Sequence, residues 1–445
     1  MSPRKLNYWQ PMTHPAATAA NPPREIVAAE GVRITDARGQ SAIDAVGGLW
    51  NVNLGYSNSA IKAAISRQLD VLPYYSSFTG VATDTAIDLA DRLIEWFAPE
   101  SMGRVFYTSG GSDSIETALR LARQIHKLRG DKDRTKFISL KKGYHGTHFG
   151  GSSINGNAKF RRNYEPLLPG CFQISCPLPY RNPFDETDPK RLAQLCAAQL
   201  DDEIRFQGPD TVAAFIMEPV LGAGGVIVPH ETFMPMVRDI CDRHGVLLIA
   251  DEVITAFGRT GAWTGSRLWN VKPDLMCIAK AITNGYFPFG ATLIAEHIVP
   301  LFESNQPDAS GDIGHGYTYS GHPVGAAAGL ATLDQIDQID VAAKARARGV
   351  ELQQGLAELS QRYDIVGDVR GVGLMAAVEI VSDAAAKTPM DKATLGKLDR
   401  AAYDAGTLVR ISGNVVILSP PLILSSQDVL AIISALDAGL AAASA

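Results

Sequence analysis

The chain has 445 residues, of which 46% are hydrophobic and 20% are charged, and its formal net charge at pH 7 is -6. This length exceeds what one hydrophobic core usually supports, so we expect two domains. The composition is typical of a soluble globular protein and argues against disordered, collagen-like and coiled-coil classes. Because the charge is mild and no basic stripe or cluster occurs, we expect neither a nucleic acid nor a membrane surface as a partner.

The cysteine content and the first residues point to an ordinary intracellular chain. Five cysteines are present, an odd number with no Cys-x-x-Cys pair, so neither a disulfide framework nor a zinc ribbon fits. Residues 1–20 lack the apolar stretch of a secretory signal, and no run of about 18 apolar residues occurs in the chain. We therefore expect a cytoplasmic protein.

A strand, a glycine-rich turn and a helix follow one another after residue 103. Residues 104–108 predict a short strand that runs into Ser-Gly-Gly-Ser at 109–112. Apolar residues then recur every three or four positions, with Asp113 and Glu116 in the first turn, where the helix dipole favours acidic side chains. Free N–H groups at such a helix start can hold a phosphate, although Gly-Gly-Ser before a helix is also an ordinary cap.

The next part of the chain is less regular. Residues 136–140 predict a strand, whereas the stretch 150–189 is rich in Gly, Asn and Pro, so we expect long surface loops there. His145 and His148 invite a metal interpretation. Their spacing is not His-Glu-x-x-His, and no acidic third ligand lies on a recognisable helix nearby, so we expect no metal site.

Three continuous apolar runs each end at a charged side chain. They are residues 212–217 before Glu218, residues 245–250 before Asp251 and residues 275–279 before Lys280. Strands that are apolar on both faces are typical of parallel sheets, and residues 233–240 predict a helix that connects the first two runs. If the three strands are parallel neighbours, the charged side chains meet at the carboxyl edge of the sheet, where open α/β sheets bind ligands.

The pattern of elements predicts an α/β fold with two domains. We expect residues 66–334 to form a large cofactor-binding domain with a mostly parallel sheet flanked by helices. Small strands precede this segment, and helices and strands alternate again from about residue 341. Residues 1–65 and 335–445 are therefore expected to form a smaller α+β domain.

An amine and a carboxylate that project from neighbouring strand ends can do several things. They can form a buried salt bridge, with no part in catalysis. Alternatively, burial lowers the pKa of the lysine, and its neutral amine becomes a Schiff-base nucleophile. A nearby aspartate such as Asp251 could then keep a pyridine nitrogen protonated. Spacing alone leaves both interpretations of Lys280 open.

These segments together resemble the class III aminotransferases, a branch of the fold-type I pyridoxal-phosphate enzymes. The match is strongest over residues 247–291, which contain LLIADEVITAFGRTG, then KPDL, then AKAITNG. Further segments that fit, in order, are YWQPM at 8–12, GLWNVNLG at 48–55, GYHG at 143–146, EPV at 218–220, GAGG at 222–225 and YTYSGHP at 317–323. The resemblance covers essentially the whole chain.

The resemblance implies a role for each residue around the cofactor, pyridoxal 5'-phosphate. Lys280 is expected to form the Schiff base and to move the proton between substrate and cofactor. Asp251 is expected to pair with the pyridine nitrogen. Tyr144 and Val253 should lie against the two faces of the ring, and Glu218 should support its polar edge.

The resemblance also implies an assembly. Gly111 and Ser112 should receive the cofactor phosphate, helped by Thr318 of the partner subunit. An active site that two subunits share implies a homodimer, alone or as a dimer of dimers.

For the substrate, the resemblance is to members that transfer an ω-amino group to pyruvate and form alanine by a ping-pong reaction. Arg410 resembles the arginine that binds a substrate carboxylate, for which a planar bidentate group is well suited. Trp50 and Leu49, with Phe78 from a second subunit, are expected to form the apolar pocket for the other end of the donor.

Three other functions remain to be weighed. A 2-oxoglutarate-dependent diamine or ω-amino acid aminotransferase differs only in the acceptor. A decarboxylase or aminomutase of the same fold would share every cofactor residue, but residues 47–50 lack the amide side chain that decarboxylating relatives place near the departing carboxylate. A non-catalytic cofactor-binding protein is disfavoured because Lys280 and Asp251 are both intact.

Overall fold

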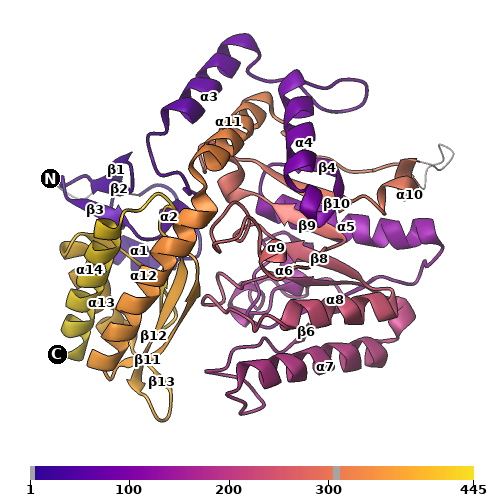
Figure 1. The fold of residues 1–445 in the computed structure, drawn as a ribbon. Coiled ribbons are helices and arrows are strands. Elements are labelled where there is room, and N and C mark those ends of the chain that lie inside the picture. Colours follow the sequence, from indigo (N-terminus) through magenta and orange to yellow (C-terminus); the bar gives the residue numbers. More distant parts are fainter. Residues whose placement is uncertain (1–5, 304–310) are drawn as a thin grey trace.

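A seven-stranded sheet forms the centre of the computed structural model, which describes residues 6–303 and 311–445 (Figure 1). The strand order is β4-β10-β9-β8-β7-β5-β6. The strands are β4 (Met102–Thr108), β5 (Lys136–Leu140), β6 (Cys171–Ile174), β7 (Val212–Met217), β8 (Leu247–Asp251), β9 (Leu275–Ile278) and β10 (Gly290–Ala295). Strands β9, β8, β7, β5 and β6 are parallel, whereas β10 is antiparallel to both β9 and β4. The predicted parallel arrangement of β7, β8 and β9 is confirmed.

Helices cover both faces of this sheet because alternate side chains of each strand point to opposite sides. Helix α5 (Gly111–Arg129) packs on one face, and α7 (Pro189–Gln207) and α8 (Phe233–His244) pack on the other. Within β7, Ile216 belongs to the same hydrophobic core as α5, whereas Phe215 belongs to the core with α7 and α8. Burial on both faces explains why the strand sequences are continuously apolar.

Two smaller sheets come from the two ends of the chain. One has the order β1-β2-β3-β14, with β1 (Ile26–Glu30), β2 (Arg33–Asp36), β3 (Ser41–Asp44) and β14 (Thr407–Leu408). The other has the order β11-β12-β16-β15, with β11 (Val366–Val372), β12 (Met375–Asp383), β15 (Arg410–Ser412) and β16 (Val415–Leu418), and β13 (Thr388–Pro389) pairs with β12. The parallel pairing of β3 with β14 joins the N-terminal strands to the C-terminal part.

Long helices connect these sheets. Helices α3 (Ser59–Val71) and α4 (Asp84–Trp96) both pack against α11 (Pro323–Ile339), and α12 (Val341–Arg362) follows α11 and packs against β11 and α14 (Ser426–Ser444). Helix α13 (Lys392–Asp404) packs against α14. Helix α3 spans the predicted boundary at residues 65/66, and α11 spans the one at 334/335. The division into two domains stays a prediction.

Short helices and 3-10 turns complete the structure. They are α1 (Pro15–Ala20), α2 (Gly47–Trp50), η1 (Ala98–Glu100), α6 (Phe149–Ile154), η2 (Ala158–Phe160), η3 (Pro209–Thr211), α9 (Gly265–Leu268), η4 (Lys280–Thr283) and α10 (Val299–Glu303). The expectation of surface loops throughout residues 150–189 is wrong, because β6 extends the central sheet next to β5 and most of α6 is buried. The sequence FGGSSI has poor helix formers and β6 has only four residues, so neither produced a periodic signal.

Helix α14 is, among the described residues, the one helix long and apolar enough to cross a membrane by length and composition alone. It packs against α12 and α13, and Asp437 in its second half forms an ion pair with Arg362 and a hydrogen bond with Tyr363. We interpret α14 as a core helix of the C-terminal part.

Arg259 is a fully buried arginine that joins three distant chain segments. Its guanidinium donates to the carbonyls of Leu374 and Pro420 and to Oδ1 of Asn53. Burial lowers its pKa to about 9, and the nearby charge of Asp44 opposes that shift. Because buried carbonyls are costly to leave without a donor, this side chain fixes how the N-terminal segment and the C-terminal part meet.

We expect Arg259→Met to destabilise the protein by roughly 3 kcal/mol or more, because three acceptors lose their donor while the side-chain volume is nearly kept. Thermal and urea unfolding would measure the change. Arg243→Met is a matched control, since the Arg243 side chain is 56% exposed on α8. Equal stability of the two variants would contradict this role of Arg259.

Candidate active site

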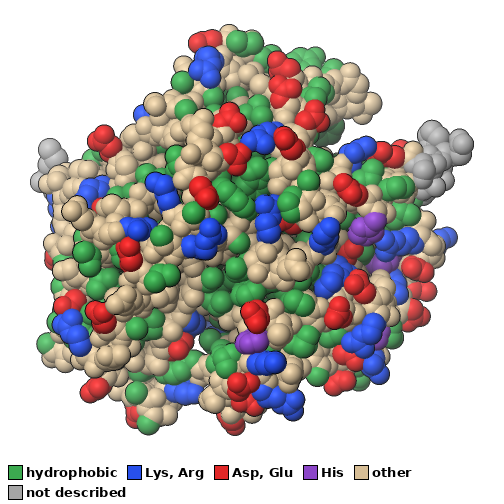
Figure 2. All heavy atoms as spheres, viewed as in Figure 1, with side chains coloured by type: hydrophobic (Ala, Val, Ile, Leu, Met, Phe, Trp, Pro, Cys, Tyr) green, Lys and Arg blue, Asp and Glu red, His purple; other side chains and the backbone are tan. Residues whose placement is uncertain are grey.

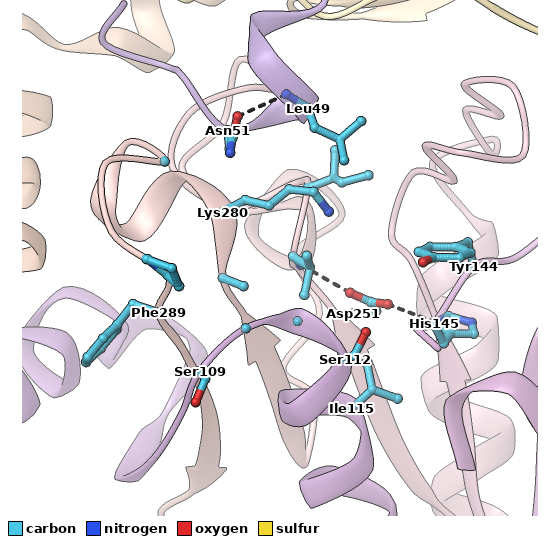
Figure 3. A pocket seen from close by; sticks show the side chains of 18 of the residues that line it. Leu49, Asn51, Ser109, Ser112, Ile115, Tyr144, His145, Asp251, Lys280 and Phe289 are labelled. Atoms are coloured by element: carbon cyan, nitrogen blue, oxygen red, sulfur yellow. Dashed lines mark hydrogen bonds and ion pairs between the residues drawn. The ribbon is translucent and has the colours of Figure 1, made fainter. Parts of the chain in front are cut away.

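A cavity of about 370 Å³ opens at the carboxyl ends of β7, β8 and β9 (Figure 3). Glu218, Asp251 and Lys280, the three residues predicted at this edge, all line it. Further lining residues come from the α2 loop (Leu49, Asn51), the start of α5 (Ser109, Gly110, Gly111, Ser112, Ile115), the turn after β5 (Tyr144, His145, Gly146), the turn after β8 (Val253, Ile254) and the segment around η4 (Ala279, Gly285, Phe287, Pro288, Phe289). The volume lies within the range of small-molecule sites.

Lys280 begins η4 directly after β9 and has a left-handed backbone with φ +50°. A non-glycine residue in that conformation costs roughly 1–2 kcal/mol, so the surrounding fold holds it there. Its amine lies in the cavity and has no hydrogen-bond partner within residues 6–303 and 311–445. Burial lowers the pKa of this amine, while the carboxylates of Asp251 and Glu218 act in the opposite direction. A lysine with a lowered pKa can act as a nucleophile through its neutral form.

Asp251 is held on both carboxylate oxygens. Oδ2 contacts Nδ1 of His145 at 2.8 Å, and Oδ1 accepts a hydrogen bond from the backbone N–H of Val253 at 3.2 Å. His145 is buried, and its backbone N–H donates a hydrogen bond to Oδ1 of Asn155 at 2.6 Å. The imidazole therefore fixes the direction in which Asp251 presents its charge to the cavity (Figure 3).

Glu218 is a second buried carboxylate beside Asp251. It accepts hydrogen bonds from the backbone N–H groups of Tyr144 at 2.9 Å and Gly222 at 2.8 Å. Burial, and then the charge of Asp251, raise the pKa of Glu218 to about 7, although His145 and both backbone hydrogen bonds act to lower it. Two buried carboxylates close together resist simultaneous ionisation.

The start of α5 forms another wall. Ser112 Oγ accepts a hydrogen bond from the backbone N–H of Thr147 at 3.2 Å. A Cβ on Gly111 would lie 3.0 Å from Val253, and one on Gly146, which has φ +91°, would lie 2.7 Å from Ser112 Oγ, so glycine is needed for this close approach. The first N–H groups of α5 can bind an anion because a helix start leaves them without intrahelical partners, and no side chain of the described residues caps them.

Tyr144 lines the cavity, and Arg410 lies close enough for its charge to act on the Tyr144 hydroxyl. The Tyr144 ring packs edge-on against Phe160, with ring centroids 4.9 Å apart. Burial raises the pKa of Tyr144, and so does the charge of Asp251, whereas the charge of Arg410 lowers it. Arg410 is half-buried at the start of β15, and no hydrogen bond to its guanidinium occurs in the described part of the chain. It is a free cation next to the cavity.

Four predicted residues, Arg410 among them, do not line the cavity of this chain. Trp50 is buried, with φ +65°, in a cluster that includes Ile254 and Val415. Phe78 is 52% exposed, and Thr318 is also exposed, with its carbonyl accepting a hydrogen bond from the Tyr74 hydroxyl. Phe78 and Thr318 were expected to act on the cavity of a second subunit, and their exposure leaves them free to do so.

Two kinds of cavity residue were not predicted from the sequence. One is His145, for which a metal site was the interpretation considered, although a turn that directly follows a sheet strand is a position where site residues occur. His148 lies apart from it and pairs with Asp113. Asn51 and Phe287 to Phe289 gave no signal, because only the chain path brings them to the cavity.

The raised pKa of Glu218 predicts a pH effect on stability. The unfolded chain loses this proton near the ordinary value of 4.5, whereas the folded protein keeps it until about pH 7. The contribution of protonated Glu218 to the free energy of unfolding is therefore complete below about pH 4.5 and is lost as the pH rises to about 7. We expect Glu218→Gln to gain thermal stability relative to the wild type as the pH rises through this window.

Melting temperatures of the ligand-free protein at several pH values would measure this difference. Glu231→Gln, at an exposed position, is the control and should track the wild type at every pH. A constant offset between Glu218→Gln and the wild type across the window would contradict the raised pKa.

Comparisons with known proteins agree with this geometry. The family model for class-III aminotransferases matches residues 15–440. A putrescine–pyruvate aminotransferase from Pseudomonas aeruginosa is 37% identical over 408 residues, which cover 91% of this chain and 88% of that protein. A diaminobutyrate–2-oxoglutarate transaminase from Halomonas elongata is 35% identical over 414 residues, which cover 92% of this chain and 88% of that protein.

Solved structures give the same result. A PLP-bound amine transaminase from an uncultivated Pseudomonas species is 48% identical, with a TM-score of 0.96 over 98% of this chain and 99% of that chain. An omega transaminase from Pseudomonas jessenii in complex with PMP is 34% identical, with a TM-score of 0.94 over 98% and 96% of the two chains. The chain belongs to the class III aminotransferases and is a fold-type I enzyme that uses pyridoxal 5'-phosphate.

Proposed function

We propose that this enzyme transfers the amino group of an ω-amino acid or a primary amine to pyruvate, which becomes alanine, in a ping-pong reaction. The observation that carries the proposal is the unpaired amine of Lys280 in one cavity with Asp251, beside the free cation of Arg410. A relative named for putrescine and pyruvate supports this choice of donor class and acceptor.

The residues that line the cavity fit pyridoxal 5'-phosphate. Lys280 offers an amine without a partner, Asp251 offers a fixed carboxylate, and the start of α5 at Gly111 and Ser112 offers N–H groups to an anion. We assign Tyr144 and Val253 to the two faces of the ring. Glu218 belongs to its polar edge, and the phosphate is shared with Thr318 of the partner subunit.

When bound, the cofactor supplies an electron sink that makes the carbon next to the substrate amine acidic. The chain's own residues do the rest. Asp251, oriented by His145, holds a proton on the ring nitrogen, because a buried carboxylate stabilises a neighbouring positive charge. With cofactor and substrate bound, the neutral amine of Lys280 would move the proton between the substrate carbon and C4′ of the cofactor. Leu49 and Ile254 line the cavity as apolar side chains that exclude water around these groups.

A homodimer is part of this proposal. Large apolar side chains are exposed near Thr318, among them Tyr74, Tyr75, Phe78 and Tyr319, and the Tyr74 and Tyr319 rings lie edge to face with centroids 6.0 Å apart. Exposed apolar patches of this kind mark protein interfaces. A second copy placed on this surface would bring Phe78 and Thr318 to the other cavity. The assembled enzyme is proposed to act in the cytoplasm.

A 2-oxoglutarate-dependent reaction is the second candidate, because one relative is named for diaminobutyrate and 2-oxoglutarate. Pyruvate and 2-oxoglutarate both carry a carboxylate that Arg410 could bind, so Arg410 does not indicate which of the two is the acceptor. Assays of taurine, β-alanine, putrescine and longer ω-amino acids against both acceptors would decide. Carbon dioxide released during turnover would instead indicate a decarboxylase.

We expect Lys280→Ala to fold but to lose transamination and the visible absorption that the loaded enzyme shows, because no other amine lines the cavity in the described structure. Circular dichroism would check folding, and spectra with and without amine would check the site. Lys272→Ala is the control, since Lys272 is exposed and donates to Ser101. Transamination by Lys280→Ala would exclude the proposed role.

We expect Arg410→Ala to raise the KM for pyruvate roughly 10- to 100-fold, the effect of losing a charge-assisted pair with a carboxylate. Amines without a carboxylate should react with the loaded enzyme at nearly the wild-type rate in the absence of acceptor. Arg400→Ala, at an exposed position on α13, is the control. Equal losses for pyruvate and for carboxylate-free amines would remove Arg410 from substrate binding.

A further inference from the structure

The α2 loop, which carries Leu49 and Asn51 into the cavity, has a fixed shape. Asp44, at the end of β3, accepts hydrogen bonds from the backbone N–H groups of Val46 at 2.9 Å, Gly47 at 3.1 Å and Gly48 at 2.6 Å. A buried carboxylate with three backbone donors holds the loop firmly. The position of Asn51 is therefore set by the fold before any substrate arrives.

The orientation of the Asn51 amide is also determined. The backbone N–H of Leu49 donates to Oδ1 of Asn51 at 3.0 Å, so the oxygen is committed and the nitrogen must point the other way. Figure 3 shows that nitrogen directed into the cavity, toward Lys280. Within the described ranges the Nδ2 group has no hydrogen-bond partner, although Asn51 is half-buried.

Gly48 and Gly285 pack against the Asn51 amide so closely that neither position has room for a side chain. A Cβ on Gly48, which has φ +66°, would lie 2.6 Å from Oδ1 of Asn51. A Cβ on Gly285, which has φ +71°, would lie 2.7 Å from Nδ2 of Asn51. Such tight packing from both sides keeps the side chain in one orientation, as a specific polar contact requires.

We propose that Nδ2 of Asn51 donates a hydrogen bond to an oxygen atom of the amino donor, so that the enzyme selects donors with an ether, hydroxyl, carbonyl or carboxylate oxygen over alkyl amines of the same shape. The inference rests on the proposed transamination. In Figure 3 Asn51 and Tyr144 lie on opposite sides of the cavity with Lys280 between them, so Asn51 contacts a different part of the substrate from Arg410, which lies beside Tyr144. An alkyl donor would leave the amide without water and without a partner.

The test compares 2-methoxyethylamine with butylamine, which differ only in an ether oxygen replaced by a methylene group. Each amine is mixed with the cofactor-loaded enzyme without a keto acid, and the rate of the visible absorption change is measured. We expect the second-order rate constant of the wild type to be about tenfold larger for the ether than for butylamine. Asn51→Asp keeps the oxygen that accepts from Leu49 but lacks the N–H donor, and Asn51→Leu keeps the shape. Both should bring the ratio close to one.

Equilibrium binding gives a readout that needs no turnover. Methoxyacetate and butyrate differ by the same exchange and contain no amine, and calorimetry should show tighter binding of methoxyacetate to the wild type and equal binding to Asn51→Leu. Leu49→Ala is the matched control: it also alters the cavity wall but offers no hydrogen bond, so it should change the rates of both amines by the same factor. Circular dichroism and cofactor absorption check that each variant folds.

The outcomes separate this inference from the function on which it rests. A wild-type ratio near one, or a ratio that both Asn51 variants leave unchanged within about twofold, would overturn the role of Asn51 while transamination stands. Failure of both amines, and of every other amine tested, to change the spectrum of the loaded wild type would overturn the proposed function itself.

Discussion

The structure depends on the meeting of one buried amine with two buried carboxylates at a single edge of the central sheet. Parallel pairing of β7, β8 and β9 brings Glu218, Asp251 and Lys280 together, because parallel strands end on the same side. Burial lowers the pKa of Lys280 and raises the pKa of Glu218, because it disfavours the charged form of each group. Nδ1 of His145 contacts Oδ2 of Asp251 at 2.8 Å and so fixes the orientation of that carboxyl group.

Different parts of the fold position the two sides of the cavity. The sheet edge and the start of α5 hold the groups that bear on the cofactor, and both belong to the main hydrophobic core. The proposed substrate side consists of the α2 loop and β15, which come from opposite ends of the chain. Asp44 holds the loop through backbone hydrogen bonds, and the buried Trp50 side chain anchors it in a hydrophobic cluster. Space-filling Figure 2 shows charged side chains of both signs scattered over the visible face, in keeping with a mild net charge.

Two of the predicted site residues lie away from the cavity of their own chain. Phe78 and Thr318 are exposed in a region rich in exposed aromatic side chains, and neither reaches the cavity of its own chain. The proposed dimer accounts for both facts at once. It also explains why selectivity would come from several sources: Arg410 for a carboxylate, Asn51 for a neutral acceptor atom, and apolar side chains for the remainder.

The amino-acid pattern was enough to locate the charged residues that follow the apolar strands. Glu218, Asp251 and Lys280 were found because strands buried on both faces leave a continuous apolar signal, and the helix after Gly110 was found from its 3.6-residue period. Only the tertiary structure decided which side chains from loops reach the same space. The strand β6 and helix α6 were missed because their segments are short or glycine-rich, Trp50 lies in a buried cluster outside the cavity, and His145 and Asn51 gained their partners through chain folding that no local period records.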